Sequence, residues 1–295
     1  MLDVNKLRNL VIAAVNASYE TDSSTGVLLS GGIDSSSVAC VAWDLPVFTG
    51  YYQGDLYDER PWARTIARMT RTDPDKDREH HEIEITPQDF VDHMDACLEC
   101  LEPPFEGPGT FGQYMVARYV SQHVETVLSG EGGDELFGGY ARLIHVAGEK
   151  MPDGYENYTP PEDYPDNLED ALVWEWDHLP ALLRVDSQVT RAHGLTARAP
   201  MAEYQPLIDY VLSLDPHHRV GKIALKNAMT GIVPEKILSR TDKRGFPVPY
   251  VEWAQKNPVR KYVKDRIGYV PDPGKPWDRQ WWLDLCETSR EKQAA

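Results

Sequence analysis

The sequence predicts an α/β fold: a parallel sheet flanked by helices, with a mainly helical C-terminal part. Short apolar runs alternate with amphipathic segments through the first 140 of 295 residues, as in chains whose helices cover a parallel sheet. Two glycine-rich segments, 30–35 (SGGIDS) and 129–135 (SGEGGDE), each follow one of these apolar runs. Each segment then continues into a stretch that can start a helix. Both loops are therefore expected at the carboxyl ends of strands, where such sheets bind ligands.

The individual elements follow from hydrophobic periodicity. Residues 5–16 place apolar side chains at helical spacing, so the chain opens with an amphipathic helix. Pro87 marks the first turn of a later helix, because proline at that position loses no helical hydrogen bond. In chain order we expect strand 27–29, helix 34–43, strand 47–52, helix 59–69, strand 81–85, helix 87–100, a helix that ends near 123, and strand 125–128.

The alternation stops beyond residue 140. Residues 151–170 hold four prolines and seven acidic residues without any lysine or arginine, a composition that predicts an acidic loop. The pattern from 172 to about 267 is mainly helical, and the tryptophans after it are expected to pack against the body: Trp277, Trp281 and Trp282. We therefore divide the chain into a core over 1–150, the acidic loop 151–170 and a helical part over 171–295 that completes the active site.

Charge, cysteine content and hydropathy exclude several classes of protein. The chain has 30 lysines and arginines against 47 aspartates and glutamates, a net charge of −17 that opposes non-specific binding to nucleic acid. Its four cysteines do not form a disulfide framework at this length. The lone CxxC of Cys97 and Cys100 favours buried helix cysteines over a zinc site. No secretory signal and no apolar run of membrane-spanning length is visible, so we expect a cytoplasmic protein without a membrane partner.

The two glycine-rich loops carry the residue types that bind a nucleotide. Glycine lets backbone amides approach an anion closely, and a helix N-terminus adds further amides and a favourable dipole. Asp34 can hold magnesium, which prefers hard oxygen ligands. A single Gly-Gly turn is common, but two such loops with acidic residues predict a nucleotide with its phosphates and a magnesium ion between the loops. The first loop is expected to surround the phosphates with amides and hydroxyls; its residues are Leu29, Ser30, Gly31, Gly32 and Ser35.

The loops also resemble known families. Residues 30–35 are similar to the SGGxDS loop of the N-type ATP pyrophosphatases, PP-loop proteins of adenine nucleotide α-hydrolase-like fold that cleave ATP between the α and β phosphates. Residues 127–140, VLSGEGGDELFGGY, resemble the signature of the synthetase domain of glutamine-dependent asparagine synthetases. β-Lactam synthetases and lasso-peptide cyclases use related domains. The resemblance implies Asp134 as the second magnesium ligand, Glu131 beside the substrate, and Ser129 and Gly130 beside the nucleotide.

The resemblance continues downstream, in segments within 184–200 and 222–246. It implies Lys222 as the essential lysine of the family, a cation directed at the phosphates and at the charge that develops during attack on an acyl-adenylate. Lys243 would assist at the pyrophosphate. Two departures concern the acyl pocket more than ATP use: Thr196 stands where the family has glutamate, and 200–203 reads PMAE instead of PFLD.

The family implies a ligase that adenylates the β-carboxylate of aspartate with ATP and then transfers ammonia, giving asparagine, AMP and pyrophosphate. Glutamine-dependent members carry an N-terminal glutaminase domain whose nucleophilic cysteine follows Met1. Here Leu2 follows Met1 and the first strand begins by residue 27, so we expect free ammonia, ammonia from a separate glutaminase, or another amine. Two alternatives stay open: an enzyme that amidates or cyclises another carboxylate, and a non-catalytic nucleotide-binding subunit. Assembly as a homo-oligomer also stays open.

Overall fold

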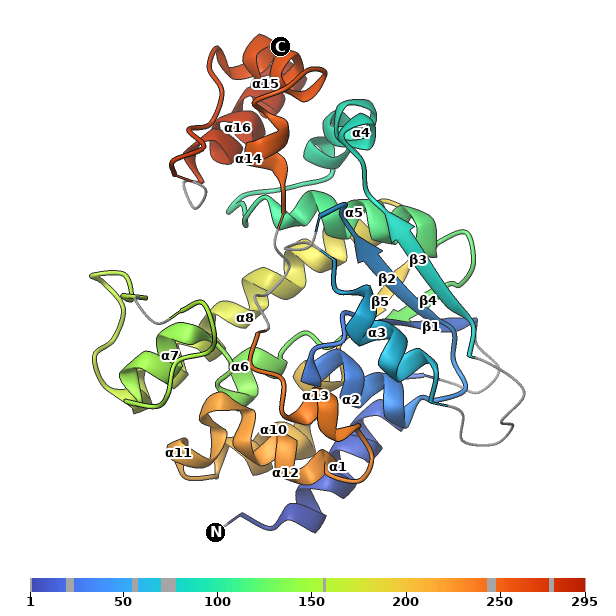
Figure 1. Cartoon of the computed structure of the whole chain (residues 1–295), viewed down its shortest axis with the longest axis vertical. Helices are drawn as coiled ribbons and strands as arrows, with labels where there is room; N and C mark the ends of the chain where they lie inside the picture. The colour runs from blue at the N-terminus through green and yellow to red at the C-terminus, as the bar shows by residue number, and fades with distance from the viewer. Residues whose placement is uncertain are drawn as a thin grey trace.

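A computed structural model describes residues 2–19, 24–54, 58–69, 78–155, 158–242, 248–275 and 279–294. It confirms the α/β class, with a parallel sheet flanked by helices (Figure 1). The sheet has the strand order β3-β2-β1-β4-β5, and each strand pairs in parallel with its neighbours. The strands are β1 (Thr25–Leu28), β2 (Val47–Tyr51), β3 (His80–Glu84), β4 (Thr126–Leu128) and β5 (Thr196–Arg198).

The helices that precede β4 confirm the predicted alternation. They are α1 (Val4–Asn16), α2 (Ile33–Val41), α3 (Arg60–Ala67), α4 (Pro87–Glu99) and α5 (Gly109–Val120). Local capping sets where two of them begin. Asp3 accepts the Lys6 amide at the start of α1, and Thr86 and Asp89 cap α4 reciprocally, with Pro87 in its first turn.

The chain beyond β4 is mainly helical, as predicted. Its elements are α6 (Gly133–Phe137), α7 (Ala141–Val146), α8 (Leu168–Arg191), α9 (Pro200–Glu203), α10 (Gln205–Leu212), α11 (Pro216–Arg219), the 3-10 helix η1 (Val220–Lys222), α12 (Ile223–Met229), α13 (Glu235–Leu238), α14 (Tyr250–Trp253), α15 (Val259–Ile267) and α16 (Gln280–Ala294). Helix α8 begins inside the predicted acidic loop, with Asn167 as its N-cap. Among the described helices, none is long and apolar enough to cross a membrane.

The predicted elements do not include β5, and the structure corrects this omission. The strand has three residues, too few to show the alternation that identifies a strand in a sequence. It forms because β4 offers an edge to pair with, so that Val127 lies opposite Ala197. The Ser129 amide donates to the Arg198 carbonyl at 2.9 Å. Strand β5 therefore supports the start of the second glycine-rich loop.

Two apolar cores cover the two faces of the sheet. Val27 and Val47 belong to the core that contains residues of α1, α2, α3, α10 and α12. Phe48 belongs to the other core, which joins α4 and α5 to the C-terminal helices α14, α15 and α16. These three helices lie beside α4 in Figure 1. The side chains on both faces of β2 are thus packed against helices.

The second core also settles two expectations about the C-terminal part and the cysteines. Trp281 and Trp282 are buried in it, which confirms the predicted packing of these side chains, while Trp277 lies outside the described residues. Cys97 is buried in the same core. Cys97 and Cys100 are both free thiols, but Cys100 is the half-buried C-cap of α4, so only Cys97 matches the predicted buried helix cysteine.

Candidate active site

The two glycine-rich loops lie side by side because β1 and β4 are adjacent strands. A Cβ added to Gly130 would lie 2.6 Å from the backbone nitrogen of Ser35. Real side chains do not come so close, so the approach of the two loops requires glycine there. Gly133, at the start of α6, is packed just as tightly against the Asp34 carboxylate. The structure therefore brings the predicted loops into direct contact at the carboxyl ends of β1 and β4.

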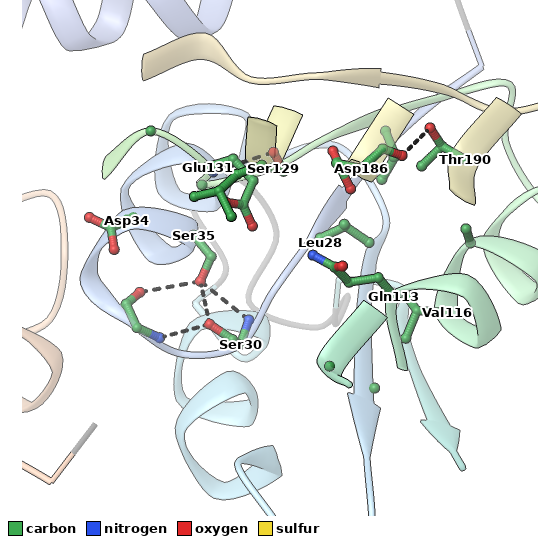
Figure 2. A pocket seen from close by; sticks show the side chains of 18 of the residues that line it. Leu28, Ser30, Asp34, Ser35, Gln113, Val116, Ser129, Glu131, Asp186 and Thr190 are labelled. Carbon is green, nitrogen blue, oxygen red and sulfur yellow. Dashed lines mark hydrogen bonds between the residues drawn. The ribbon is translucent and has the colours of Figure 1, made fainter. Parts of the chain in front are cut away.

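The first loop is closed on itself by its own serines (Figure 2). The Ser35 hydroxyl lies 3.1 Å from the Ser30 hydroxyl and accepts the Ser30 amide at 3.2 Å. The Ser30 hydroxyl in turn accepts the Gly32 amide at 3.3 Å. A phosphate oxygen can compete for these donors at the N-terminus of α2. Gly31 shapes the loop instead, because its φ is 73° and Trp62 fills the space where its Cβ would be.

Lys222 lies between the two predicted magnesium carboxylates. Its amine forms an ion pair with Asp34 and a second one, at 2.8 Å, with Asp134. Burial opposes the ammonium charge, but the two carboxylates outweigh burial and raise the pKa of the Lys222 amine above its ordinary value. The predicted cation and the predicted metal ligands therefore form one charged cluster, although Lys222 and Asp34 are 188 positions apart.

The backbone around Lys222 holds the amine in this position. Lys222 has a φ of 61°, and it follows Gly221, whose φ is 66°. The left-handed conformation costs about 1 to 2 kcal/mol for a residue with a side chain, so the surrounding structure must maintain it. The Gly221 amide donates to the Gly138 carbonyl at 2.8 Å, which ties the lysine to the second loop. There is no room for a side chain at Gly139, because a Cβ there would collide with the carboxylate of Asp134 and the side chain of Lys222.

One oxygen of the Asp34 carboxylate accepts a hydrogen bond from the Lys222 amine, and the other has no partner among the described residues. Oδ1 is buried and has no hydrogen-bond partner in the described part of the chain, and burial raises the pKa of this carboxyl. An unpaired buried oxygen costs free energy that a cation would recover. No three His, Cys, Asp or Glu side chains of the described residues form a complete metal cage. Mg²⁺ is commonly held by one or two carboxylates together with substrate phosphates, and Asp34 with Asp134 fits that arrangement.

A cavity of about 440 Å³ lies beside this cluster, between the two loops and helices α5 and α8 (Figure 2). Its size is typical of small-molecule sites. Lys222 and Gly31 do not line it, but Lys222 contacts two residues that do. Lys243 lies outside the described residues. The predicted site residues that line the cavity are Leu29, Ser30, Gly32, Asp34, Ser35, Ser129, Gly130, Glu131 and Asp134.

Another part of the cavity wall comes from residues without a predicted role. Asp186 and Thr190 lie one turn apart on α8, and Gln113 comes from α5. Glu135 and Tyr140 belong to the segment 127–140, and the Tyr140 hydroxyl donates to the Glu135 carboxylate at 2.6 Å. The RVD tripeptide that ends at Asp186 is the sequence signal that could identify this residue. Gln113 has no comparable signal in the sequence.

The pKa values of Glu131, Glu135 and Asp186, three carboxyl groups of the cavity, are all raised. Burial, followed by the nearby Asp186 carboxylate, raises the pKa of Glu131 to about 8. Burial also raises the pKa of Glu135 to about 7, although the hydrogen bond from Tyr140 opposes this shift. Burial alone raises the pKa of Asp186 to about 6. Glu131 can therefore exchange a proton near neutral pH, which is the property that a general acid or base requires.

The raised pKa of Asp186 predicts a pH dependence of stability. Its carboxyl keeps a proton in the folded chain up to about pH 6, whereas an aspartate in an unfolded chain loses its proton near pH 4. The folded state binds more protons between these values, so its free energy of unfolding falls as the pH rises. Relative to Asp186→Asn, which cannot ionise, the wild type should lose about 2 kcal/mol between about pH 4.5 and about pH 7.5. Urea unfolding of both proteins measures this difference, and a constant difference would contradict the shift.

The five-stranded parallel sheet with an SGGxDS loop after its central strand defines the class, an α/β protein whose parallel sheet is flanked by helices. The chain belongs to the asparagine synthase family, whose family profile matches residues 6–172 and 160–277. This confirms the resemblance of the two loops.

The chain spans about half the length of the curated relatives it matches. It is 25% identical over 347 aligned residues to the glutamine-hydrolysing asparagine synthetase 1 of Bacillus subtilis, covering 90% of this chain and 52% of that protein. It is 28% identical over 259 residues to the glutamine-hydrolysing asparagine synthetases of Rattus norvegicus and Homo sapiens, covering 80% of this chain and 42% of those proteins.

Proposed function

We propose that the chain uses ATP to activate a carboxylate as an acyl-adenylate and then transfers the acyl group to a nitrogen nucleophile. One observation carries the proposal: the two glycine-rich loops and the cluster of Lys222 with Asp34 and Asp134 converge beside a single cavity. A binding module for ATP alone does not require a buried lysine between two carboxylates. Membership of a family of ATP-using ligases supports the same reaction class.

The reaction has two steps. A carboxylate oxygen attacks the α-phosphorus of ATP, the bond from that phosphorus to the bridging oxygen breaks, and pyrophosphate leaves with the electron pair. The nitrogen nucleophile then attacks the carbonyl carbon, AMP leaves, and the nitrogen gives up a proton. Activation is needed because the oxygen of a free carboxylate is a poor leaving group, whereas AMP leaves readily.

The residues of the chain divide these tasks. The amides and hydroxyls of Ser30, Gly32 and Ser35 bind the pyrophosphate. The Lys222 ammonium stabilises the negative charge that develops on the phosphates. Glu131, whose pKa is about 8, accepts the proton that the nitrogen loses. A magnesium ion held by Asp34 and Asp134 would neutralise phosphate charge.

Aspartate is the first acid to test, and ammonium is the first nitrogen source, because the relatives are named as asparagine synthetases. The experiment measures pyrophosphate release with ATP, magnesium and aspartate, with ammonium or glutamine as the nitrogen source, and identifies the product by mass spectrometry. Asparagine from ammonium but not from glutamine would support ammonia use, with a separate glutaminase as a further candidate partner. ATP binding without pyrophosphate release from any carboxylate would instead support a non-catalytic nucleotide-binding subunit.

A second candidate is amidation or cyclisation of an acid other than aspartate. The observation that favours it is the charge of the cavity wall, where carboxylates outnumber cations among the described residues. The same pyrophosphate assay distinguishes the candidates by which acid drives turnover.

The metal assignment makes a separate prediction. Asp134→Asn removes one of two anionic oxygen ligands, so we expect the magnesium concentration for half-maximal pyrophosphate release to rise about 10-fold or more. Titration of pyrophosphate release with MgCl₂ at saturating ATP measures this shift. Asp265→Asn, an exposed substitution on α15, is the control and should leave the titration unchanged. A wild-type magnesium curve for Asp134→Asn would remove this residue from the metal site.

A further inference from the structure

Among the described residues, the acidic and basic side chains that line the cavity are all carboxyl groups. Six carboxylates line it: Asp34, Glu106, Glu131, Asp134, Glu135 and Asp186. No lysine, arginine or histidine lines it in the part of the chain that the structure describes. The ammonium of Lys222 adjoins the cavity, but it is already paired with Asp34 and Asp134. Glu106 pairs with the guanidinium of Arg279 at 3.9 Å, whereas Glu131, Glu135 and Asp186 form no ion pair within the described residues.

Four of these six carboxyl groups lie in the glycine-rich loops, and those of Glu106 and Asp186 lie outside them. Asp34 and Asp134 lie in the glycine-rich loops, where the phosphates and the magnesium ion of the proposed reaction would bind. Asp186 comes from α8 instead, beside Thr190. Figure 2 shows Asp186 across the cavity from Ser30 and Asp34, near Glu131. A ligand that fills the cavity would therefore meet the phosphate-binding loops at one end and Asp186 at the other.

Asp186 is a buried residue on the α8 side of the cavity. The residue is only 6% exposed. Its backbone carbonyl accepts the Thr190 hydroxyl at 2.8 Å, but its carboxylate has no hydrogen bond or ion pair within the described residues, and burial alone raises its pKa. A buried carboxylate without a partner is costly, and a bound cation recovers that cost. The side chain is thus suited to receive a positive group from a ligand.

We propose that the acid activated here carries an amine or guanidinium group and no second free carboxylate, and that Asp186 binds that cation. The inference rests on the proposed function and specifies its substrate. The carboxyl group to be activated lies towards the glycine-rich loops, where its oxygen attacks the α-phosphorus of ATP. The cationic group lies towards α8. Aspartate satisfies only half of this requirement, because its α-carboxylate would meet a wall that offers it no lysine, arginine or histidine among the described residues.

The test compares four acids that share the reacting propanoate group. β-Alanine carries an ammonium alone, aspartate carries an ammonium and a carboxylate, succinate carries a carboxylate alone, and propanoate carries neither. Hydroxylamine traps each acyl-adenylate as a hydroxamate, so the rates depend on activation and not on the natural nitrogen source. 4-Aminobutanoate and 4-guanidinobutanoate extend the cationic set to longer acids.

We expect kcat/KM for hydroxamate formation to be highest for the best cationic acid, lower for aspartate and lowest for succinate. The first and the last should differ by at least about 10-fold. If kcat/KM for aspartate or succinate equals or exceeds that for every cationic acid, the inference is overturned and the proposed function stays intact. Hydroxamate from none of the acids, with ATP still bound, would overturn the proposed function and the inference together.

Variants separate recognition of the cation from a structural role of Asp186. Asp186→Asn should lower kcat/KM for the best cationic acid about 10- to 100-fold, and change kcat/KM for propanoate much less. Asp177→Asn on the same helix, which is exposed, should affect neither acid. An equal loss for both acids in Asp186→Asn would show that the side chain supports the fold of the site, and would overturn its assignment to the cation.

Discussion

Replacing Lys222 with alanine is expected to lower the rate of pyrophosphate release about 100- to 1000-fold. This is the range for removing one preorganised group that stabilises charge in a transition state. The lysine amine is the cation that contacts both Asp34 and Asp134, and its side chain is 11% exposed. Water can therefore replace it only poorly. Release is measured with saturating ATP and magnesium and the best acid found above.

The same substitution should also affect stability, and this must be measured separately. Removing one partner of a buried ion pair typically destabilises a protein by about 3 to 5 kcal/mol, because the other charge stays buried without compensation. Urea unfolding of Lys222→Ala reports this loss. Lys222→Arg keeps the charge but changes the shape of the cation, so it shows whether charge alone restores stability. An exposed lysine on α15, Lys261, serves as the control, and Lys261→Ala should change neither rate nor stability.

Two results would contradict the role of Lys222. Normal pyrophosphate release by a folded Lys222→Ala would remove the amine from the reaction. A large loss of stability with an unchanged rate would assign Lys222 to the structure of the cluster alone. Only a large loss of rate in protein that is still folded, shown by circular dichroism at the assay temperature, supports the proposed role.

Gly130→Ala should have the second largest effect, through the contact between the two glycine-rich loops. The new Cβ would lie 2.6 Å from the Ser35 nitrogen and 3.0 Å from the carbonyl carbon of Asp34. Both are backbone atoms, so no side chain can rotate to relieve the overlap. The loops must separate, which costs about 1 to 3 kcal/mol. Because displacement by about 1 Å can reduce a rate about 100-fold, we expect a loss of this size in kcat/KM for ATP.

Gly148→Ala is the matched control for this prediction. Gly148 has a φ of 69° and no atom within 4 Å of its added Cβ. The control therefore carries the cost of a left-handed backbone, about 1 to 2 kcal/mol, without a steric overlap. Its kcat/KM for ATP should match the wild type. Wild-type values for Gly130→Ala in both stability and kcat/KM would mean that the two loops do not act as one site.

Local sequence patterns were sufficient for much of the fold. The apolar run at 27–29 and the glycine-rich loop after it predict a strand, a turn and a helix from neighbouring residues alone, and β1 and α2 confirm them. The same holds for α4, whose predicted start at Pro87 is confirmed. These signals are local because propensity, capping and periodicity act between residues within a few positions of one another.

Strand β5 and the wall from α8 required the tertiary structure. Three residues, Thr196–Arg198, become a strand only because β4 supplies a pairing edge. Asp186 becomes a cavity residue only because α8 packs beside α5. Neither relation leaves a periodic pattern in the sequence, since each depends on packing between segments that are far apart in the chain.

The sequence by itself determined the α/β class, the two loops that resemble the asparagine synthase family, and the residue types that can bind phosphate and magnesium. Only the tertiary structure decided that Lys222 pairs with Asp34 and Asp134, that Gly31 shapes its loop instead of lining the cavity, and that Asp186 lines the wall beyond the phosphate site. The physical reason is that chemistry at a site depends on distance and burial. A sequence specifies which groups exist, but the fold sets which charges meet and how much water surrounds them.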